Sequence, residues 1–325
     1  MKLPRRNFLH LAAGAAALPA VSRVAWAQAY PSRPVRLIVP FPPGGTNDIV
    51  ARAIAPPLSD RLGKQVVVDN RAGASAVVGS ELVANAPKDG HTLLVISLTH
   101  AINPWLYKLP YDPVKGFAPV AVIASGPLVL TVHPDLEAKS VNELIALAKA
   151  KPGQLQYASP GIGTPPHLSA ELFKIATGID MLHVPFRGGG PANIDLIGGH
   201  TKLMFNNLPT AMPHIRSGKL RALGVGGIER AAILPDVPTI AEAGVPGYEA
   251  NNWWGILAPA GTPTAIVERL HNEIATVQSL AEVQRQLATE GAEVVRNTSA
   301  EFGSFLANEM NKWERVVKTA NIKAE

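Results

Sequence analysis

The sequence contains no cysteine among its 325 residues. This absence excludes disulfides, thiol nucleophiles, cysteine zinc sites, iron–sulfur clusters and a lipidated N-terminal cysteine. Charged residues are also few, at 17%, whereas 47% of the residues are hydrophobic. This balance predicts folded domains with sizeable cores and argues against intrinsic disorder. The body of the chain has no apolar run of about 18 residues, so the sequence predicts no internal membrane span.

Residues 1–27 have the layout of an export signal. Three basic residues form a head, residues 8–20 are mostly apolar, and Ala25-Trp26-Ala27 supplies a small-x-small cleavage site. We therefore predict a signal peptide over residues 1–27 and an exported, periplasmic protein. The pair Arg5-Arg6 is also similar to a twin-arginine signal, so the general secretory and twin-arginine routes both stay open.

Removal of this segment changes the charge of the protein. Cleavage after Ala27 removes four of the 30 basic residues and none of the 25 acidic ones, which leaves a net charge of +1. The remaining basic residues are scattered and are not interleaved with aromatic ones. We therefore expect no nucleic-acid partner.

The body of the chain alternates between short apolar runs and segments with helical spacing. The length allows two domains, and alternating strands and helices predict an α/β protein with mainly parallel sheets and helices on both faces. Glycine and proline separate these segments as turn residues. The expected strands are 35–40, 65–69, 92–97, 120–124, 128–133, 155–158, 181–184, 202–205 and 220–225. The expected helices are 46–62, 76–86, 140–151, 164–177, 264–288 and 299–318.

Two glycine-rich loops share one layout. Residues 39–45 read Val-Pro-Phe-Pro-Pro-Gly-Gly, and residues 184–190 read Val-Pro-Phe-Arg-Gly-Gly-Gly. Each follows a strand and opens a helix, whose first N–H groups lack internal partners and attract anions. Two such loops can hold an anion between two lobes, or they can be ordinary turns whose glycines only permit tight packing. Neither loop has dinucleotide or P-loop spacing.

Several motifs, taken in their order and spacing, resemble the solute receptors of tripartite tricarboxylate transporters, the Bug-type periplasmic binding proteins. The resemblance runs along essentially the whole chain. The matching stretches are Tyr30–Val35, Phe41–Asp48, Val68–Ala74, Pro87–Leu93, Thr99–Pro104, Tyr157–Gly161, His183–Pro191, Pro235–Thr239 and Trp254–Pro259.

The resemblance implies a two-lobed type II periplasmic binding protein fold with the ligand cleft between the lobes. The chain of such proteins crosses twice between lobes, which we place near residues 126–128 and 250–254. Lobe one is then 30–127 plus 252–325, and lobe two is 128–251.

The resemblance also implies a function. Family members hold a small carboxylate with backbone N–H groups of the first glycine loop and with ordered waters, and the second lobe closes over it. The implied partners are the membrane permease subunits of a tripartite tricarboxylate transporter. A sensor protein without a transport role is the alternative. We expect a monomer.

The predicted ligand contacts come from both glycine loops and from strand ends that face the same cleft. They are Phe41, Gly44, Gly45, Thr46, Asp48, Arg71, Ser97, Thr99, Ser159, Gly163, Thr164, His167, Arg187, Gly188, Gly189 and Asn206.

Several of these side chains have a purely structural alternative in lobe one. Thr46 and Asp48 can cap the helix that begins there. Arg71 can form a salt bridge within the lobe. Ser97 and Thr99 can bond the local turn instead of a ligand.

Lobe two leaves similar alternatives. His167 can be a packed side chain of its helix, whereas Arg187 lies within the second glycine loop. Asn206 stands where many relatives carry aspartate, which removes a negative charge and bears on ligand preference. Trp253 and Trp254 fall at the return crossing, where we expect them to pack.

Catalysis is the competing class of function. The sequence lacks a Gly-x-Ser-x-Gly elbow, a His-Glu-x-x-His helix and a phosphate loop, and its nine histidines are dispersed. Asp48, Ser159 and His167 are the candidate triad of an exported hydrolase, the alternative to a receptor. We predict a binding protein without enzyme activity, cofactor or metal. Dicarboxylates, tricarboxylates, aromatic acids, amino acids and nicotinate-like acids all fit, so the ligand stays open.

Overall fold

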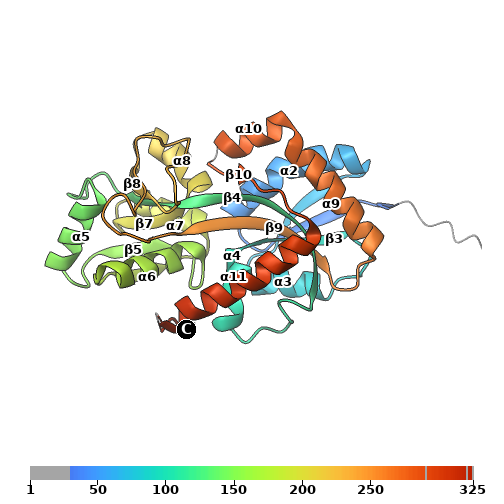
Figure 1. Ribbon diagram of the computed structural model, residues 1–325, viewed down its shortest axis with the longest axis horizontal. Coiled ribbons are helices and arrows are strands. Elements are labelled where there is room, and N and C mark those ends of the chain that lie inside the picture. The colour runs from blue at the N-terminus through green and yellow to red at the C-terminus, as the bar shows by residue number, and fades with distance from the viewer. Residues whose placement is uncertain (1–29, 290, 320, 324–325) are drawn as a thin grey trace, which may run out of the picture.

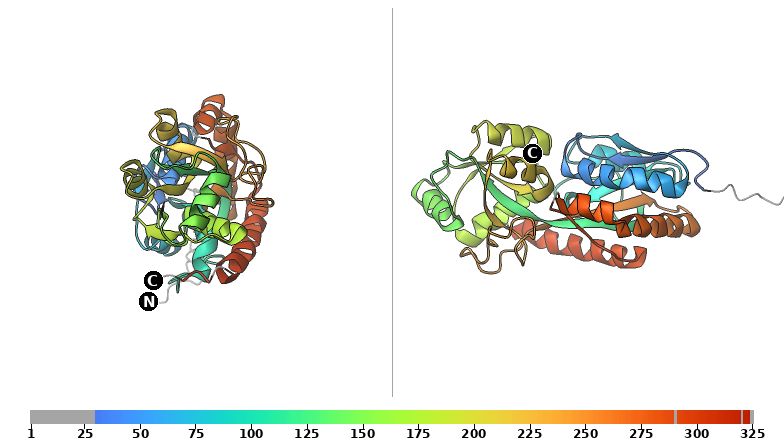
Figure 2. Two further views of the ribbon diagram at one scale, coloured as in Figure 1. Left: turned by 90° about the vertical axis from the view of Figure 1, so that its left-hand side faces the viewer. Right: turned by 90° about the horizontal axis from the view of Figure 1, so that it is seen from above.

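The computed structural model of the protein describes residues 30–289, 291–319 and 321–323. The predicted signal peptide lies outside these residues. Two α/β lobes lie side by side and are joined by two long strands, β4 (Phe117–Val132) and β9 (Asn251–Pro259) (Figures 1 and 2). Among the helices described, none is long and apolar enough to cross a bilayer.

The sheet of lobe one has the strand order β2-β1-β3-β9-β4, and β10 pairs with β4 at its edge. Helices α2, α9 and α10 cover one face, and α3, α4 and α11 cover the other. The strands are β1 (Val35–Val39), β2 (Val66–Asn70), β3 (Thr92–Ser97), the first part of β4 (Phe117–Val132), β9 (Asn251–Pro259) and β10 (Glu293–Val294). The helices are α2 (Thr46–Leu62), α3 (Val77–Ala84), α4 (Leu98–Ile102), the 3-10 turn η1 (Asn103–Trp105), α9 (Thr264–Ser279), α10 (Ala281–Thr289) and α11 (Ser299–Thr319).

Lobe two is built on the second part of β4. That part pairs with β7 and with β8, and β7 continues the sheet to β5 and β6. Helices α5 and α6 cover one face, and α7 and α8 cover the other. The elements are α5 (Val141–Ala150), β5 (Gln156–Ser159), α6 (Pro165–Thr177), β6 (Leu182–Pro185), α7 (Gly189–Ile197), β7 (Leu203–Asn207), α8 (Leu208–Arg216) and β8 (Arg221–Val225).

Alternation along the central strands of lobe one explains why both faces of the sheet are covered. Leu37 and Leu93 lie in the core beneath α2 and α9. Their neighbours Ile38 and Leu94 lie in the core beneath α11 on the other face. Successive side chains of a strand point to opposite faces, so an uninterrupted apolar run requires helices on both sides. The predicted α/β class is confirmed.

The connection between the lobes differs from the prediction. The two strands expected at 120–124 and 128–133 form one 16-residue strand, β4, which passes from the first sheet into the second. Its partner β9, which sequence analysis did not predict, runs antiparallel to it from Phe117↔Pro259 to Pro127↔Asn251. Parallel pairing is therefore confined to β1 with β2 and β3 and to β5 with β6 and β7. The prediction of mainly parallel sheets is wrong, because every pairing of β4 and β9 is antiparallel. We keep 30–127 plus 252–325 and 128–251 as the proposed lobe boundaries.

The single helix predicted over 264–288 is wrong, because the chain breaks at Leu280 into α9 and α10. Leu280 has extended backbone, with ψ 125°, and packs against the core of lobe one. Just before it, the buried amide of Gln278 donates to the carbonyl oxygens of Val122, Ile123 and Val295. These long-range hydrogen bonds fix the end of α9. The sequence there has no glycine or proline that would indicate a helix end.

We predict that Gly255→Ala destabilises the fold. A Cβ at Gly255 in β9 would lie 2.5 Å from the ring of Phe302 and 3.1 Å from the carbonyl oxygen of Ala121. Overpacking of this kind should lower the free energy of unfolding by about 1–3 kcal/mol. Urea unfolding of the variant and the wild type measures the difference. The matched control is Gly303→Ala in α11, whose Cβ would lie 3.5 Å from Pro119. That variant should be as stable as the wild type, and equal stability of both variants would contradict the prediction.

Candidate ligand-binding site

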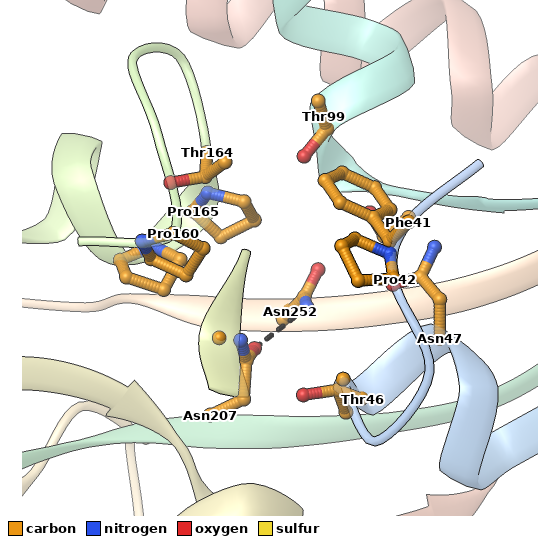
Figure 3. A pocket seen from close by; sticks show the side chains of 14 residues that line it. Phe41, Pro42, Thr46, Asn47, Thr99, Pro160, Thr164, Pro165, Asn207 and Asn252 are labelled. Atoms are coloured by element: carbon orange, nitrogen blue, oxygen red, sulfur yellow. Dashed lines mark hydrogen bonds between the residues drawn. The ribbon is translucent and has the colours of Figure 1, made fainter. Parts of the chain in front are cut away.

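A cavity lies between the lobes. Figure 3 shows its labelled side chains facing one another across the gap, with Phe41 and Thr99 opposite Thr164 and Pro165. Within the part of the chain that the structure describes, no acidic, basic or histidine side chain lines it. The lining residues are Phe41, Pro42, Gly45, Thr46, Asn47, Ser97, Thr99, Pro160, Thr164, Pro165, Pro166, Gly189, Asn207 and Asn252.

The first glycine loop brings the start of α2 to the cavity. Gly44 has φ +78°, a left-handed conformation that lets the chain turn from β1 into α2. Gly45 is the N-cap and has no side chain to bond the first turn. The N–H groups of Thr46 and Asn47 have no partner within the helix, because the first turn lacks preceding carbonyls. Both residues line the cavity, at the positive end of the helix dipole.

Two polar side chains in the cavity wall are buried without a hydrogen-bond partner. Asn47 is 6% exposed and Thr99 is 1% exposed. The Nδ2 of Asn47 and the Oγ1 of Thr99 have no hydrogen-bond partner among the residues that the structure describes. An unpaired buried polar group costs about 1–3 kcal/mol. A ligand with acceptor oxygens would pair both, so they are candidate ligand contacts. Sequence analysis missed Asn47, although its place in the first turn after the glycine loop was a usable signal.

An asparagine pair forms the floor of the cavity and ties the lobes together. Asn252 of β9 donates through Nδ2 to Asn207 Oδ1 of β7 at 2.8 Å (Figure 3). Its own Oδ1 accepts from the backbone N–H groups of Trp253 and Leu98. Neither asparagine was predicted, because both lie on strands whose pairing joins residues far apart in the chain.

Asn206 was predicted in place of its neighbour Asn207. Alternation along β7 turns these side chains to opposite faces. Asn206 is fully buried, donates to Asn193 and accepts from Thr210. The structure therefore gives Asn206 a structural role and places Asn207 at the cavity.

The second lobe supplies the opposite wall through the starts of α6 and α7. Thr164 is the N-cap of α6, and its hydroxyl donates to Gly161 O at 2.6 Å. Pro165 and Pro166 follow in the first turn, and Gly189 is the first residue of α7. The wall that faces a ligand is therefore apolar apart from backbone groups and one hydroxyl.

The structure brings about half of the predicted contacts together. Seven line the cavity, and two line a neighbouring hollow at its rim. The seven are Phe41, Gly45, Thr46, Ser97, Thr99, Thr164 and Gly189. The two are Arg187 and Gly188. The others, which line neither, are Gly44, Asp48, Arg71, Ser159, Gly163, His167 and Asn206.

Asp48 and Arg71 are engaged within lobe one. The carboxylate of Asp48 accepts from Gly44 N, Arg52 Nε and Asn70 Nδ2. Burial alone would raise the pKa of Asp48, but these bonds outweigh it and the pKa is lowered. The guanidinium of Arg71 lies 2.8 Å from Asp69. Asp48 therefore fixes the glycine loop from behind, and Arg71 forms the salt bridge that was its structural alternative.

A buried ring stack lies behind the loop that carries Thr164. The rings of His167 and His183 stack 4.1 Å apart, and Tyr157 stacks on His183 at 4.8 Å. Gly163 N donates to His167 Nδ1, and Ser159 Oγ lies 2.6 Å from His183 Nε2. These groups support the wall of the cavity and do not face it.

The lobes touch at the rim of the cavity. Ser75 Oγ of lobe one donates to Ile162 O of lobe two at 3.0 Å. Tyr107 OH lies 3.2 Å from Ser75 Oγ and 3.3 Å from Ile162 O. Gly188 approaches so near that a Cβ there would lie 3.1 Å from the ring of Pro42. The cleft is therefore closed over the cavity.

Residues 50–322 match the tripartite tricarboxylate transporter family receptor. The chain belongs to this family. Protein BugT of Bordetella pertussis is 39% identical over 300 residues, which cover 91% of this chain and 92% of that protein. The resemblance inferred from the motifs is thereby confirmed.

Two solved structures of similar proteins share the architecture. A periplasmic transporter is 40% identical, with a TM-score of 0.88, and the match covers 91% of this chain and 99% of that one. An R. palustris protein with adipate is 38% identical, with a TM-score of 0.88, and the match covers 91% and 100%. The predicted periplasmic binding protein fold is confirmed.

We predict that Gly188→Ala weakens ligand binding by hindering closure. Gly188 has φ +117°, where a side chain is strained, and its Cβ would press on Pro42 of the other lobe. The contact with Pro42 exists only in the closed form, and overpacking of about 1–3 kcal/mol there should lower affinity about fivefold or more in calorimetry. Gly190→Ala is the control, because nothing lies within 4 Å of its Cβ. Equal affinities of the two variants would argue against closure as the cause.

We also predict that stability falls as the pH drops from about 6.5 toward 4. Burial lowers the pKa of His167 to about 4 and that of His183 to about 3, so both are neutral in the fold. The unfolded chain takes up protons below a pKa of about 6.5, so protonation favours unfolding. Urea midpoints measured from pH 7 to pH 5, above most carboxylate titrations, should fall. The urea midpoint of His183→Phe should fall less steeply with pH than that of the wild type. An identical slope would show that His183 does not contribute to the pH dependence of stability.

Proposed function

We propose that the protein is a periplasmic receptor that captures a small organic carboxylate in the interlobe cavity and delivers it to a membrane permease. The observation that carries this proposal is the pair of unpartnered buried groups, Asn47 Nδ2 and Thr99 Oγ1, in a cavity whose described lining has no charged side chain. The adipate in the R. palustris relative supports a carboxylate ligand, and the family's receptor role supports a permease partner over a sensor.

Backbone groups and neutral donors suffice to hold a carboxylate here. The first-turn N–H groups of Thr46 and Asn47 and the dipole of α2 favour an anion at the glycine loop. The side chains of Asn47 and Thr99 add donors on the same wall. Charge-assisted hydrogen bonds are about twice as strong as neutral ones, and a dry site strengthens them further. The carboxylate therefore needs no arginine at this end.

The chemistry of the cavity supports binding without turnover. A hydrolase would need Asp48, Ser159 and His167 in contact, but Ser159 Oγ bonds His183 and Asp48 bonds Arg52. The lining residues supply no general base. Each chain also encloses a complete cavity, which supports a monomer as the working unit.

The proposal is tested by calorimetry on the chain without residues 1–27. We expect one carboxylate bound per chain, and small-angle scattering should show a smaller radius of gyration when it binds, because the lobes close around a ligand. Tight binding of a neutral sugar together with no heat from any organic acid would refute the proposal.

A second prediction concerns the unpartnered hydroxyl. Thr99→Val replaces it with a methyl group of similar shape, so unfolding free energy should be unchanged or higher. Affinity for the carboxylate should fall about tenfold, since one hydrogen bond to a charged group is lost.

The matched control is Thr131→Val. Thr131 is fully buried, and its hydroxyl donates to Met204 O at 3.0 Å in lobe two, away from the cavity. This variant should lose about 1 kcal/mol of unfolding free energy and keep its affinity. If Thr99→Val lost stability and kept affinity, the hydroxyl would be structural.

A further inference from the structure

A second hollow opens beside the cavity. The two share Phe41, Pro42 and Pro160, which form an apolar boundary between them. Both lobes line the hollow. The residues that belong to it alone are Pro40, Ala72, Gly73, Ala74, Ser75, Ala76, Gly161, Phe186, Arg187 and Gly188.

Arg187 distinguishes the hollow from the cavity. It is the one charged side chain among the described residues that line either space. It is exposed, and no carboxylate of the described chain lies within ion-pair distance of it. Arg52 and Arg71, on the other side of the cleft, are paired with Asp48 and Asp69. The positive charge of Arg187 is therefore available to a ligand.

The two spaces differ in the ligand group that each can accept. The inner cavity offers neutral donors and apolar walls, which suit one carboxylate and the carbon atoms next to it. The boundary of one phenylalanine and two prolines suits a hydrocarbon chain, which gains by leaving water. Beyond this boundary, the planar guanidinium of Arg187 can bind a second carboxylate with two parallel hydrogen bonds.

We infer that the hollow is a distal subsite and that the receptor prefers elongated dicarboxylates, with Arg187 holding the second carboxylate. The inference rests on the proposed function, because it assigns the far end of a ligand whose near end occupies the inner cavity. A diacid too short to reach the hollow leaves Arg187 free. A longer diacid passes the boundary and gains the second ion pair.

The test is calorimetry with α,ω-dicarboxylates from malonate to suberate and with monocarboxylates of equal carbon number. We expect wild-type affinity to rise with diacid length once the chain spans the boundary, and longer diacids to bind more tightly than their monoacid counterparts. Arg187→Gln should lower affinity for the long diacids about tenfold and leave the monoacids unchanged. Arg187→Lys keeps the charge and should recover part of the loss.

The charge-matched control is Arg285→Gln, since Arg285 is exposed on α10, away from both spaces. It should leave every affinity unchanged, and thermal midpoints confirm that all variants fold. Equal losses for monoacids and diacids in Arg187→Gln, or no loss for either, would overturn the distal subsite while carboxylate binding stands. Failure of the wild type to bind any acid would overturn the proposed function and this inference with it.

Discussion

The antiparallel pairing of β4 with β9 is the constraint on which the site depends. Because β4 continues from the first sheet into the second and pairs with β9 up to Pro127↔Asn251, the two lobes share one backbone and cannot slide past each other. The lobes can still move about this connection as about a hinge, because two strands bend more easily than a sheet with helices packed on both faces. The floor of the cavity lies on this connection, where Asn252 of β9 meets Asn207 of β7. The same strands therefore set the lobe separation and place polar groups beneath the ligand.

The lining of the cavity follows from the energetics of burying an anion. Burying an arginine in this cavity would cost the hydration free energy of its guanidinium group. The group would also be left without a partner whenever the ligand dissociated. Helix N-termini and amide or hydroxyl groups are neutral and held in place by the backbone. Their free-energy cost when the ligand dissociates is therefore smaller than that of an unpaired arginine. Asp48 contributes by bonding Gly44 N and thus shaping the glycine loop, with Arg52 neutralising it on the outer side. Charged groups hold the loop in place, and neutral groups meet the ligand.

Sequence analysis predicted what depends on local pattern and missed what depends on pairing. The helices α5 and α6 and the two glycine loops all have local signals, and each appears at the expected place. The strand β9 and the break at Leu280 have none, because distant partners fix them. Asn207 was missed for the same reason. A shift of one residue in the register of β7 would turn each of its side chains to the opposite face of the sheet. Only the pairing with β4 therefore determines which asparagine faces the cavity.

The rim shows how closure can be favoured before a ligand arrives. Ala74, Ser75 and Ala76 all have positive φ, which costs residues with a Cβ about 1 kcal/mol or more each. Bonds within lobe one hold this segment, since Asn103 Nδ2 donates to Ser75 O at 2.7 Å and Tyr107 OH reaches Ser75 Oγ. These bonds do not involve lobe two, so they do not depend on closure. Ser75 needs no ordering when lobe two approaches, so its bond to Ile162 contributes to closure with little loss of conformational entropy.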